Sequence, residues 1–411
     1  MNRLAVLLLI AAASSAALSE TPKAPSPAER SIAQARQLIE KNPKNFEAYN
    51  ALALALSRRA RETSDVNYYT QAEDALRQSF AISPDNFDGA RIHVWLLLGK
   101  HEFAAALEEA KKLNKRLPDD VMTYGFLTDA NVELGNYNDA EKSAQMMLDL
   151  RPGNLPALTR AAYLRELFGD VDGSLELMNT ALESTAPSEV EDRAWILTQM
   201  AHLELSVGKA ADAENYLQQA LLLFPGYHYA LGTLAKVRIE QKRYDEAVKL
   251  LEQRYDAAPH AENLFDLAEA LQFAGRSEDA KKAFAEFEQK SLLESNRGDN
   301  SNRELIFYYA DYAHQPAKSL EVAQNEFARR HDVFTLDAYA WALHVNGRNR
   351  EARKEIEEAL AVGIRDPKLI KHAGEIALAA GDRAAGDKYL RQAAELNAVE
   401  AANAKPAAAH L

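Results

Sequence analysis

The strongest constraint on the fold is a pattern that recurs about every 34 residues along most of the chain. Gly135 and Gly169 are 34 residues apart, as are Gly347 and Gly381. The glycines that mark this pattern stand at positions 99, 135, 169, 208, 275, 347 and 381, and Lys242 fills the position 34 residues after Gly208. Between these anchors, apolar residues recur at spacings of three and four, which indicates helices. The repeat length therefore predicts a series of helical hairpins that pack on one another.

Small residues also keep fixed places in each unit, and each has a mechanical reason. A small residue on the first helix lets the second helix approach closely; these residues are Ala201, Ala235, Ala268, Ala340 and Gly374. An alanine five residues after the turn does the same from the other side; these are Ala104, Ala140, Ala213, Ala247, Ala280 and Ala352. The glycine ends the first helix in a left-handed conformation. Pro152, Pro225 and Pro259 end second helices.

This arrangement resembles the tetratricopeptide repeat family, whose units combine a large residue, Leu-Gly, an aromatic residue, a later Ala and a closing Pro. The unit around Gly135 shows it with Tyr124 and Leu127 before the glycine, then Tyr137, Ala140, Met147 and Pro152. The resemblance covers most of the chain. It implies an all-α fold, an α-solenoid in which about nine to ten antiparallel hairpins form a right-handed superhelix. Because one hairpin buries too little surface alone, neighbours must supply the stability.

The pattern divides the chain into six parts. We expect a signal peptide at 1–19, a linker and capping helix at 20–44, an N-terminal array at 45–290, a polar joint at 291–302, a C-terminal array at 303–397 and a disordered tail at 398–411. The capping helix is expected from about Pro27 to Lys41. The unit at 302–331 is degenerate, with His331 where a proline is expected.

The first residues predict export. Arg3 supplies a positive start, Leu4 to Ile10 is an apolar run, and Ala17-Leu18-Ser19 fits a cleavage site. We expect a periplasmic or secreted protein whose mature chain has no integral membrane segment. An uncleaved N-terminal anchor is the alternative that the sequence leaves open.

Composition excludes several kinds of chemistry. The formal charge is −13, from 48 Lys and Arg against 61 Asp and Glu. Such a chain repels nucleic acid unless a local basic patch overrides the field, and no such patch occurs. With no cysteine there is no disulfide, thiol nucleophile or cysteine zinc site. The sequence carries no catalytic motif, so we expect no enzyme activity, catalytic residue, metal site or cofactor. A faint calcium-loop likeness at 170–176 is better explained as a turn.

The resemblance also implies a binding groove, because first helices of such repeats line the concave face. The residues implied there are Asp129, Tyr163, His202, Tyr229, Lys236, Phe265, Glu269 and Trp341. Lys236 and Lys371 are too far apart to form the carboxylate clamp of some family members. Two functions remain open at this stage. One is an exported scaffold or adaptor that holds a protein or peptide partner, in envelope assembly or secretion; the other is a carbohydrate-binding component of an envelope polysaccharide system.

Overall fold

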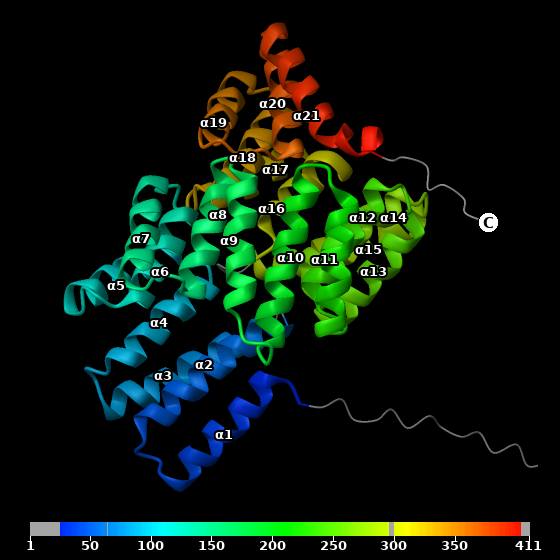
Figure 1. Cartoon of the computed structure of the whole chain (residues 1–411). Helices are drawn as coiled ribbons and strands as arrows, with labels where there is room; N and C mark the ends of the chain where they lie inside the picture. The colour runs from blue at the N-terminus through cyan, green and yellow to red at the C-terminus, as the bar shows by residue number, and fades with distance from the viewer. Residues whose placement is uncertain (1–24, 64, 296–299, 404–411) are drawn as a thin grey trace, which may run out of the picture.

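The computed structural model describes residues 25–63, 65–295 and 300–403, and the regular structure within these residues is entirely helical (Figure 1). Helix α1 (Pro27–Lys41) precedes the hairpins and packs on the first of them without belonging to a pair, as the sequence predicts. Ser26 begins it with a capping box, because its hydroxyl accepts the Glu29 N–H at 3.2 Å while Glu29 bonds back to the Ser26 N–H at 2.7 Å. The all-α solenoid predicted from the repeats is confirmed.

Ten hairpins follow α1 in the described part of the chain, each made of an even-numbered first helix and an odd-numbered second helix. They are α2 (Phe46–Thr63) with α3 (Asn67–Ile82), α4 (Phe87–Gly99) with α5 (Phe103–Arg116), α6 (Val121–Glu133) with α7 (Tyr137–Leu150), α8 (Leu155–Leu167) with α9 (Val171–Ser184), α10 (Val190–Ser206) with α11 (Ala210–Leu223), α12 (His228–Glu240) with α13 (Tyr244–Ala257), α14 (Ala261–Phe273) with α15 (Ser277–Glu294), α16 (Asn302–Phe307) with α17 (Pro316–Phe327), α18 (Val333–Val345) with α19 (Asn349–Ala361), and α20 (Pro367–Ala379) with α21 (Arg383–Asn403).

The turns inside the hairpins explain the glycine spacing. Gly135 and Gly169 end α6 and α8 with φ of 75° and 81°, a conformation that costs glycine little. Lys242 takes the same conformation at φ 59°, as its place in the pattern requires.

The sequence pattern places one hairpin turn two residues too early, at Gly99 instead of His101. Gly99 lies inside α4, and His101 takes the left-handed conformation at φ 56°. Position 99 requires glycine because of a side-chain contact, since a Cβ there would lie 2.9 Å from the ring of Tyr69. The alanine that packs against the first helix is accordingly Ala106, which is fully buried, and not Ala104, which is exposed.

The small residues let paired helices pack closely. The buried first-helix residues are Ala201, Ala235, Ala268 and Ala340, and the buried second-helix residues are Ala140, Ala213, Ala247, Ala280 and Ala352; each has no exposed surface. Larger side chains from successive hairpins then fill the space between them. Met147, Met200 and Leu217, for example, are also fully buried.

The joint at 291–302 does not interrupt the core. Helix α15 continues to Glu294, and Phe284 and Phe287 pack in one cluster with Leu305 and Tyr309 beyond the joint. The degenerate unit is irregular in structure too, because α16 passes into a π-helical turn, η1 (Tyr308–Tyr312), before α17 begins.

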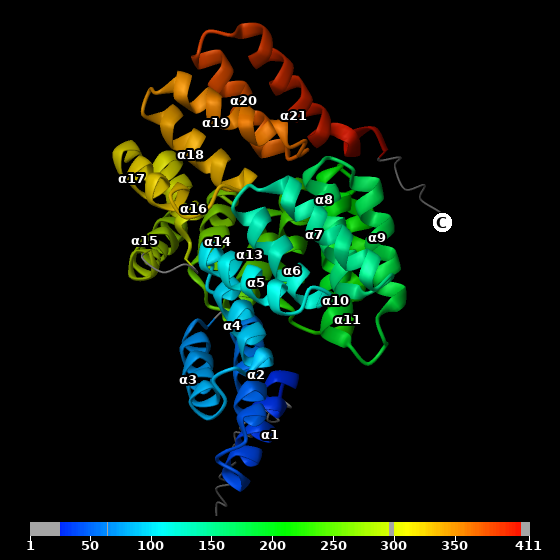
Figure 2. The same ribbon diagram turned by 90° about the vertical axis from the view of Figure 1, so that its left-hand side faces the viewer.

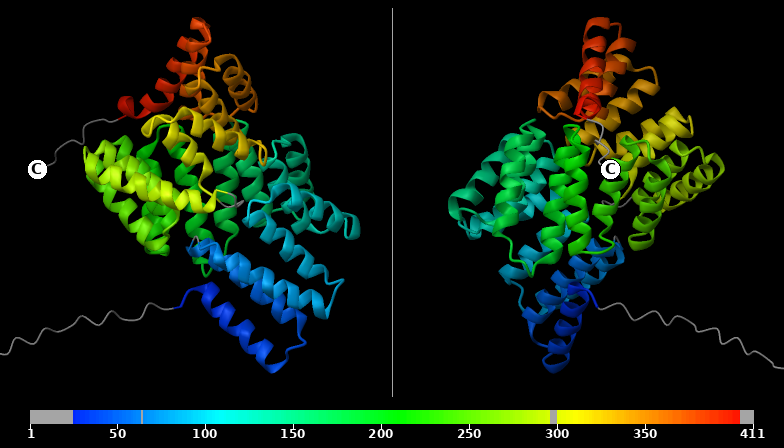
Figure 3. Two further views of the ribbon diagram at one scale, coloured as in Figure 1. Left: turned by 180° about the vertical axis from the view of Figure 1, so that it is seen from behind. Right: turned by 45° about the vertical axis from the view of Figure 1, so that its right-hand side comes forward.

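The solenoid closes on itself. Helix α18, drawn orange-yellow, lies beside α8 (Figures 1 and 2), and the C-terminal hairpins stand above the middle of the chain when the molecule is seen from behind (Figure 3). One hydrophobic cluster joins Val132 and Leu167 to Val333, Leu336 and Leu343. We call this contact the seam. A chain of hairpins that could have stayed open therefore encloses its inner face.

The backbone itself takes part in the seam. The His331 N–H donates to the Glu133 carbonyl at 2.9 Å, and the Val333 N–H donates to the Tyr137 hydroxyl at 3.0 Å. These bonds join residues almost 200 positions apart in the sequence. The end of the degenerate unit around His331 thus forms the edge that contacts α6 and α7 at the seam.

The predicted signal peptide at 1–19 lies outside the described residues, as do residues 404–411 of the predicted tail. Helix α21 extends to Asn403, beyond the predicted boundary at residue 397. No helix in the described part of the chain is both long and apolar enough to cross a bilayer.

Candidate functional site

Asp129 and Tyr163, both named from the sequence, line one pocket of about 250 Å³ on the first helices α6 and α8. We call it the Tyr163 pocket. Its apolar wall is made by Leu98, Phe103, Val132 and the Tyr163 ring, and its polar rim by His101, Thr128, Asp129, Glu133 and Arg160. A pocket with an apolar wall and a few fixed polar groups suits a side chain that enters from the inner face.

The polar rim is held by ion pairs. Arg160 donates two hydrogen bonds to the Asp129 carboxylate, from Nε at 2.7 Å and from Nη2 at 2.5 Å. On the other side Arg330 pairs with Glu133 and lies over the Phe103 ring, 5.2 Å from its centre. The rim is therefore fixed before any guest arrives, which reduces the entropy lost on binding.

Charges from several hairpins meet beside this pocket, around Arg303 of α16. Its guanidinium lies 3.5 Å from the Asp332 carboxylate. Burial by itself would lower the pKa of Arg303, but Asp332, Glu304 and Glu133 together raise it. These carboxylates come from α6, α16 and the N-cap of α18, so the inner face is narrow enough for opposite sides to interact electrostatically.

Two groups on the inner face, the Glu304 carboxyl and the Tyr163 phenol, resist ionisation. Burial, assisted by the nearby Glu262 carboxylate, raises the pKa of Glu304 to about 7, against the lowering effect of Arg303. Burial likewise raises the pKa of Tyr163, and the charges of Glu133 and Asp332 add to it.

Four further predicted residues lie on the first helices α10, α12 and α14. His202 bonds to Glu166 through Nε2 at 2.8 Å. Lys236 is exposed, and Glu269 accepts a hydrogen bond from the Tyr312 hydroxyl at 2.7 Å. Tyr229 keeps 39% of its surface exposed. None of these four lines the Tyr163 pocket.

The last two predicted residues lie in the core. Phe265 is 3% exposed and packs against Phe284 and Phe287. Trp341 is 8% exposed, with its indole N–H donating to Asp311 at 2.8 Å and its ring stacked on His372. Both rings are covered from the side of η1, whose Asp311 and Tyr312 reach them. We leave these two out of the candidate site.

Sequence reasoning missed Glu133, Arg303, Glu304, Arg330 and Asp332. They fall at helix ends or in the degenerate unit, away from the positions that repeats usually present to a guest. The available signal was the run Arg330-His331-Asp332, which replaces the expected proline with two charges and a histidine.

No group of three or more His, Cys, Asp or Glu among the described residues is arranged to hold a metal ion. The calcium-like run at 170–176 begins α9: Asp170 accepts the Gly173 N–H at 3.0 Å and pairs with Arg165 at 3.1 Å.

Comparisons with known proteins point to one repeat family. The sequence model of the tetratricopeptide repeat family matches residues 204–259, which run from the end of α10 to the end of α13. A relative is the TPR repeat-containing protein YpiA of Bacillus subtilis (strain 168), 25% identical over 264 residues. That alignment covers 62% of this chain and 57% of YpiA, so the chain spans a little over half of its relative.

Solved structures agree on the fold. Human IFIT1 crystallised as a dimer with PPP-AAAA is 14% identical, with a TM-score of 0.50 over 91% of this chain and 95% of that one. The human IFIT1 dimer with m7Gppp-AAAA is 15% identical, with a TM-score of 0.51 over 90% and 86%. At this identity the likeness concerns the helical architecture alone.

Proposed function

The chain is a tetratricopeptide-repeat protein, and from that premise we propose that it is a scaffold whose inner face holds an extended segment of a protein partner. The Tyr163 pocket receives one anchoring side chain of that segment. The charged groups around Arg303 set the polarity of the surface beside it.

The observation that carries this proposal is the pairing of an apolar wall with a prearranged polar rim in the Tyr163 pocket. A guest side chain that covers Leu98, Phe103 and Tyr163 gains the burial energy that dominates binding hot spots. Asp129 and Arg160, already paired, can still offer hydrogen bonds to the adjoining peptide backbone.

A peptide suits this face better than a sugar. Carbohydrate stacking needs flat aromatic faces open to solvent, yet the rings of Phe265 and Trp341 are covered by core contacts. Of the predicted aromatic residues only Tyr229 is exposed, Tyr163 is half-buried, and the exposed groups around them are mainly charged side chains. Such a surface matches the mixture of donors, acceptors and side chains along a polypeptide.

A binding experiment tests this. Arrays of short unstructured peptides and of glycans are probed with the wild-type protein, and the tightest peptide is measured against Tyr163→Ala. We expect at least about a tenfold weaker affinity, since an aromatic contact of about 1.5–3 kcal/mol is lost. Tyr244→Ala, a half-buried tyrosine of the second helix α13, is the matched control and should change affinity less than about twofold. Equal losses, or binding to glycans only, would overturn the proposal.

We also propose that the protein works outside the cytoplasm, in the periplasm or as a secreted protein, in envelope assembly or secretion. The support is the charged, apolar and small-residue order of residues 1–19. Mass spectrometry of the protein from fractionated cells should find a chain that begins at residue 20, in the exported fraction. An intact Met1 chain confined to the cytosol would contradict it.

A further inference from the structure

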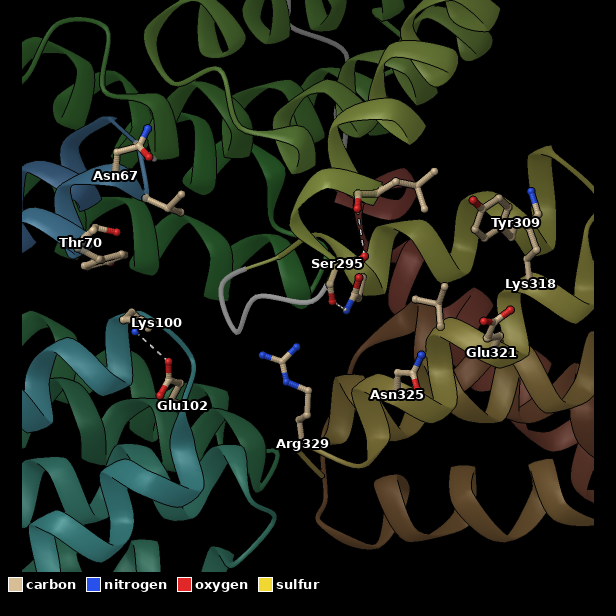
Figure 4. Close-up of a pocket in the computed structure, with 15 residues that line it drawn as sticks. Asn67, Thr70, Lys100, Glu102, Ser295, Tyr309, Lys318, Glu321, Asn325 and Arg329 are labelled. Atoms are coloured by element: carbon tan, nitrogen blue, oxygen red, sulfur yellow. Dashed lines mark hydrogen bonds and ion pairs between the residues drawn. The ribbon is translucent and has the colours of Figure 1, made fainter. Parts of the chain in front are cut away.

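A second, larger cavity opens between the N-terminal hairpins and the degenerate unit. It has a volume of about 1080 Å³. Its walls are α3 with the α4–α5 turn on one side, and the end of α15 with α16, η1 and α17 on the other (Figure 4). We call it the α3–α17 cleft. Its size lies at the upper end of what ligand pockets usually offer, and no contact of the repeat pattern requires it to be open.

Neutral polar side chains face this cleft from both walls. Asn67 and Thr70 come from α3 and Asn325 from α17 (Figure 4). Asn302 lines the cleft from the start of α16. Asn302 is 2% exposed, and its amide nitrogen donates to Glu326 and to the Ser295 carbonyl, while its Oδ1 has no hydrogen-bond partner. A buried acceptor without a partner costs free energy.

The charged side chains of the cleft are of both signs, and several of them pair locally; they are Lys100, Lys318 and Arg329 with Glu102 and Glu321. Lys100 pairs with Glu73 at 2.6 Å and with Glu102 at 2.9 Å. Lys318 lies 3.9 Å from Glu288. The cleft therefore offers no concentrated field for a phosphate or a metal ion, and its recognition rests on hydrogen bonds and apolar contact.

The cleft adjoins the Tyr163 pocket. Glu102 lines the cleft and the next residue, Phe103, lines the pocket. Across from them Arg329 lines the cleft, while Arg330 lies over the Phe103 ring. The two cavities thus stand on either side of one contact in the seam, and the seam fixes the distance between the cleft walls.

We propose that the α3–α17 cleft is a second binding site, which holds the main chain of an extended polypeptide on its way to the Tyr163 pocket. This rests on the proposed function and names the conformation of the guest. Amide side chains both donate and accept, so they match the alternating N–H and C=O groups of a peptide whatever its sequence. Val66 and Val322 supply apolar contact for its side chains.

The aromatic residues of the cleft favour a peptide over a glycan. Tyr69 and Tyr309 both line it, but they are only 8% and 2% exposed. No open ring face is left on either for a sugar to stack on. The polar groups that the cleft does present are amides, hydroxyls and locally paired charges.

The absence of cysteine from the chain gives a clean test. N325C places one thiol in the cleft, and Q324C places one on the same exposed stretch of α17 outside it. The probe is the tightest peptide from the array, at about ten times its Kd. We expect maleimide labelling of N325C to slow about tenfold, as the free fraction falls, and that of Q324C to change less than about twofold.

A filling variant checks the result from the opposite wall. Thr70→Trp should weaken the peptide about tenfold by occupying the cleft, while Gln71→Trp, exposed on the same helix but outside the cleft, should not. If the peptide binds and depends on Tyr163 but leaves N325C unprotected, the cleft proposal fails and the proposed function stands. If glycans alone bind, both fail.

Discussion

At the scale of single residues, Gly169 meets two separate demands. Its φ of 81° favours glycine, and a Cβ on it would lie 2.5 Å from the Gly363 carbonyl oxygen across the seam. Gly275 meets only the first, since its φ is 73° and nothing lies within 4 Å of its Cβ position. Alanine variants at the two positions therefore separate the free-energy cost of the left-handed turn from that of a clash across the seam.

We predict that Gly275→Ala costs about 1–2 kcal/mol of unfolding free energy, the price of a left-handed alanine. Gly169→Ala should cost at least about 1 kcal/mol more, because the added methyl group must push the seam apart. Urea denaturation of both variants measures this. Equal losses would mean that the α8–α9 turn does not touch Gly363 in solution.

Glu304 gives the inner face a pH dependence. Its pKa rises from the ordinary 4.5 to about 7, so the folded chain holds this proton more tightly than the unfolded chain does. The stabilisation from Glu304 protonation is thus complete below pH 4.5 and is lost as the pH rises through 7.

We predict that Glu304→Gln makes the protein more stable than wild type at pH 8, by about 1–2 kcal/mol, and that this advantage shrinks toward pH 5. Glu358→Gln, at an exposed position on α19, is the control and should show no such trend. Thermal melts between pH 5 and pH 8 supply the data. An advantage of E304Q that stayed constant with pH would refute the assignment.

At the scale of elements, the hairpin turn decides where each first helix ends. Most turns use glycine, but Lys242 and His101 adopt left-handed conformations with side chains. We predict that Lys242→Gly stabilises the protein by about 0.5–1 kcal/mol, because strain at φ 59° is relieved. Gly347→Ala, where a Cβ would meet nothing within 4 Å, should change stability in the opposite direction. A destabilised Lys242→Gly would show that its side chain is needed for another reason.

The hairpins were predictable because they depend on local periodicity. Ala140, Ala213 and Ala247 repeat at the same place after each turn, and a helical pattern reads directly from such spacing. Gly99 misled the register because a glycine required for contact with Tyr69 looks the same in sequence as one required for a turn.

At the scale of the whole molecule, closure depends on a buried charge cluster. Arg330 has 8% of its side chain exposed and is approached by Glu133, Glu326 and Asp332. We predict that Arg330→Gln costs about 3–5 kcal/mol, because these carboxylates then lose their common partner in a buried site. Arg383→Gln, 91% exposed beside Asp387, should cost less than about 0.5 kcal/mol. Chemical denaturation compares the two, and a cost for R330Q as small as that for R383Q would contradict the seam.

Closure could not be predicted from the repeats. Tyr137 and Val333 are hydrogen-bonded although they are almost 200 positions apart in the sequence. A 34-residue period does not indicate which distant units contact each other. The same limit explains the site. Asp129 and Tyr163 share a pocket because their helices are neighbours, whereas Phe265 and Trp341 are covered by η1, a shape that only the degenerate unit adopts.

Site-specific photo-crosslinking shows whether a polypeptide lies inside the closed solenoid. A photoreactive residue replaces His202, on the inner face beside Glu166, or Lys281, 73% exposed on α15. With the tightest peptide from the array, we expect crosslinks from position 202 and none from position 281. Crosslinks from position 281 alone, or equally from both, would contradict it.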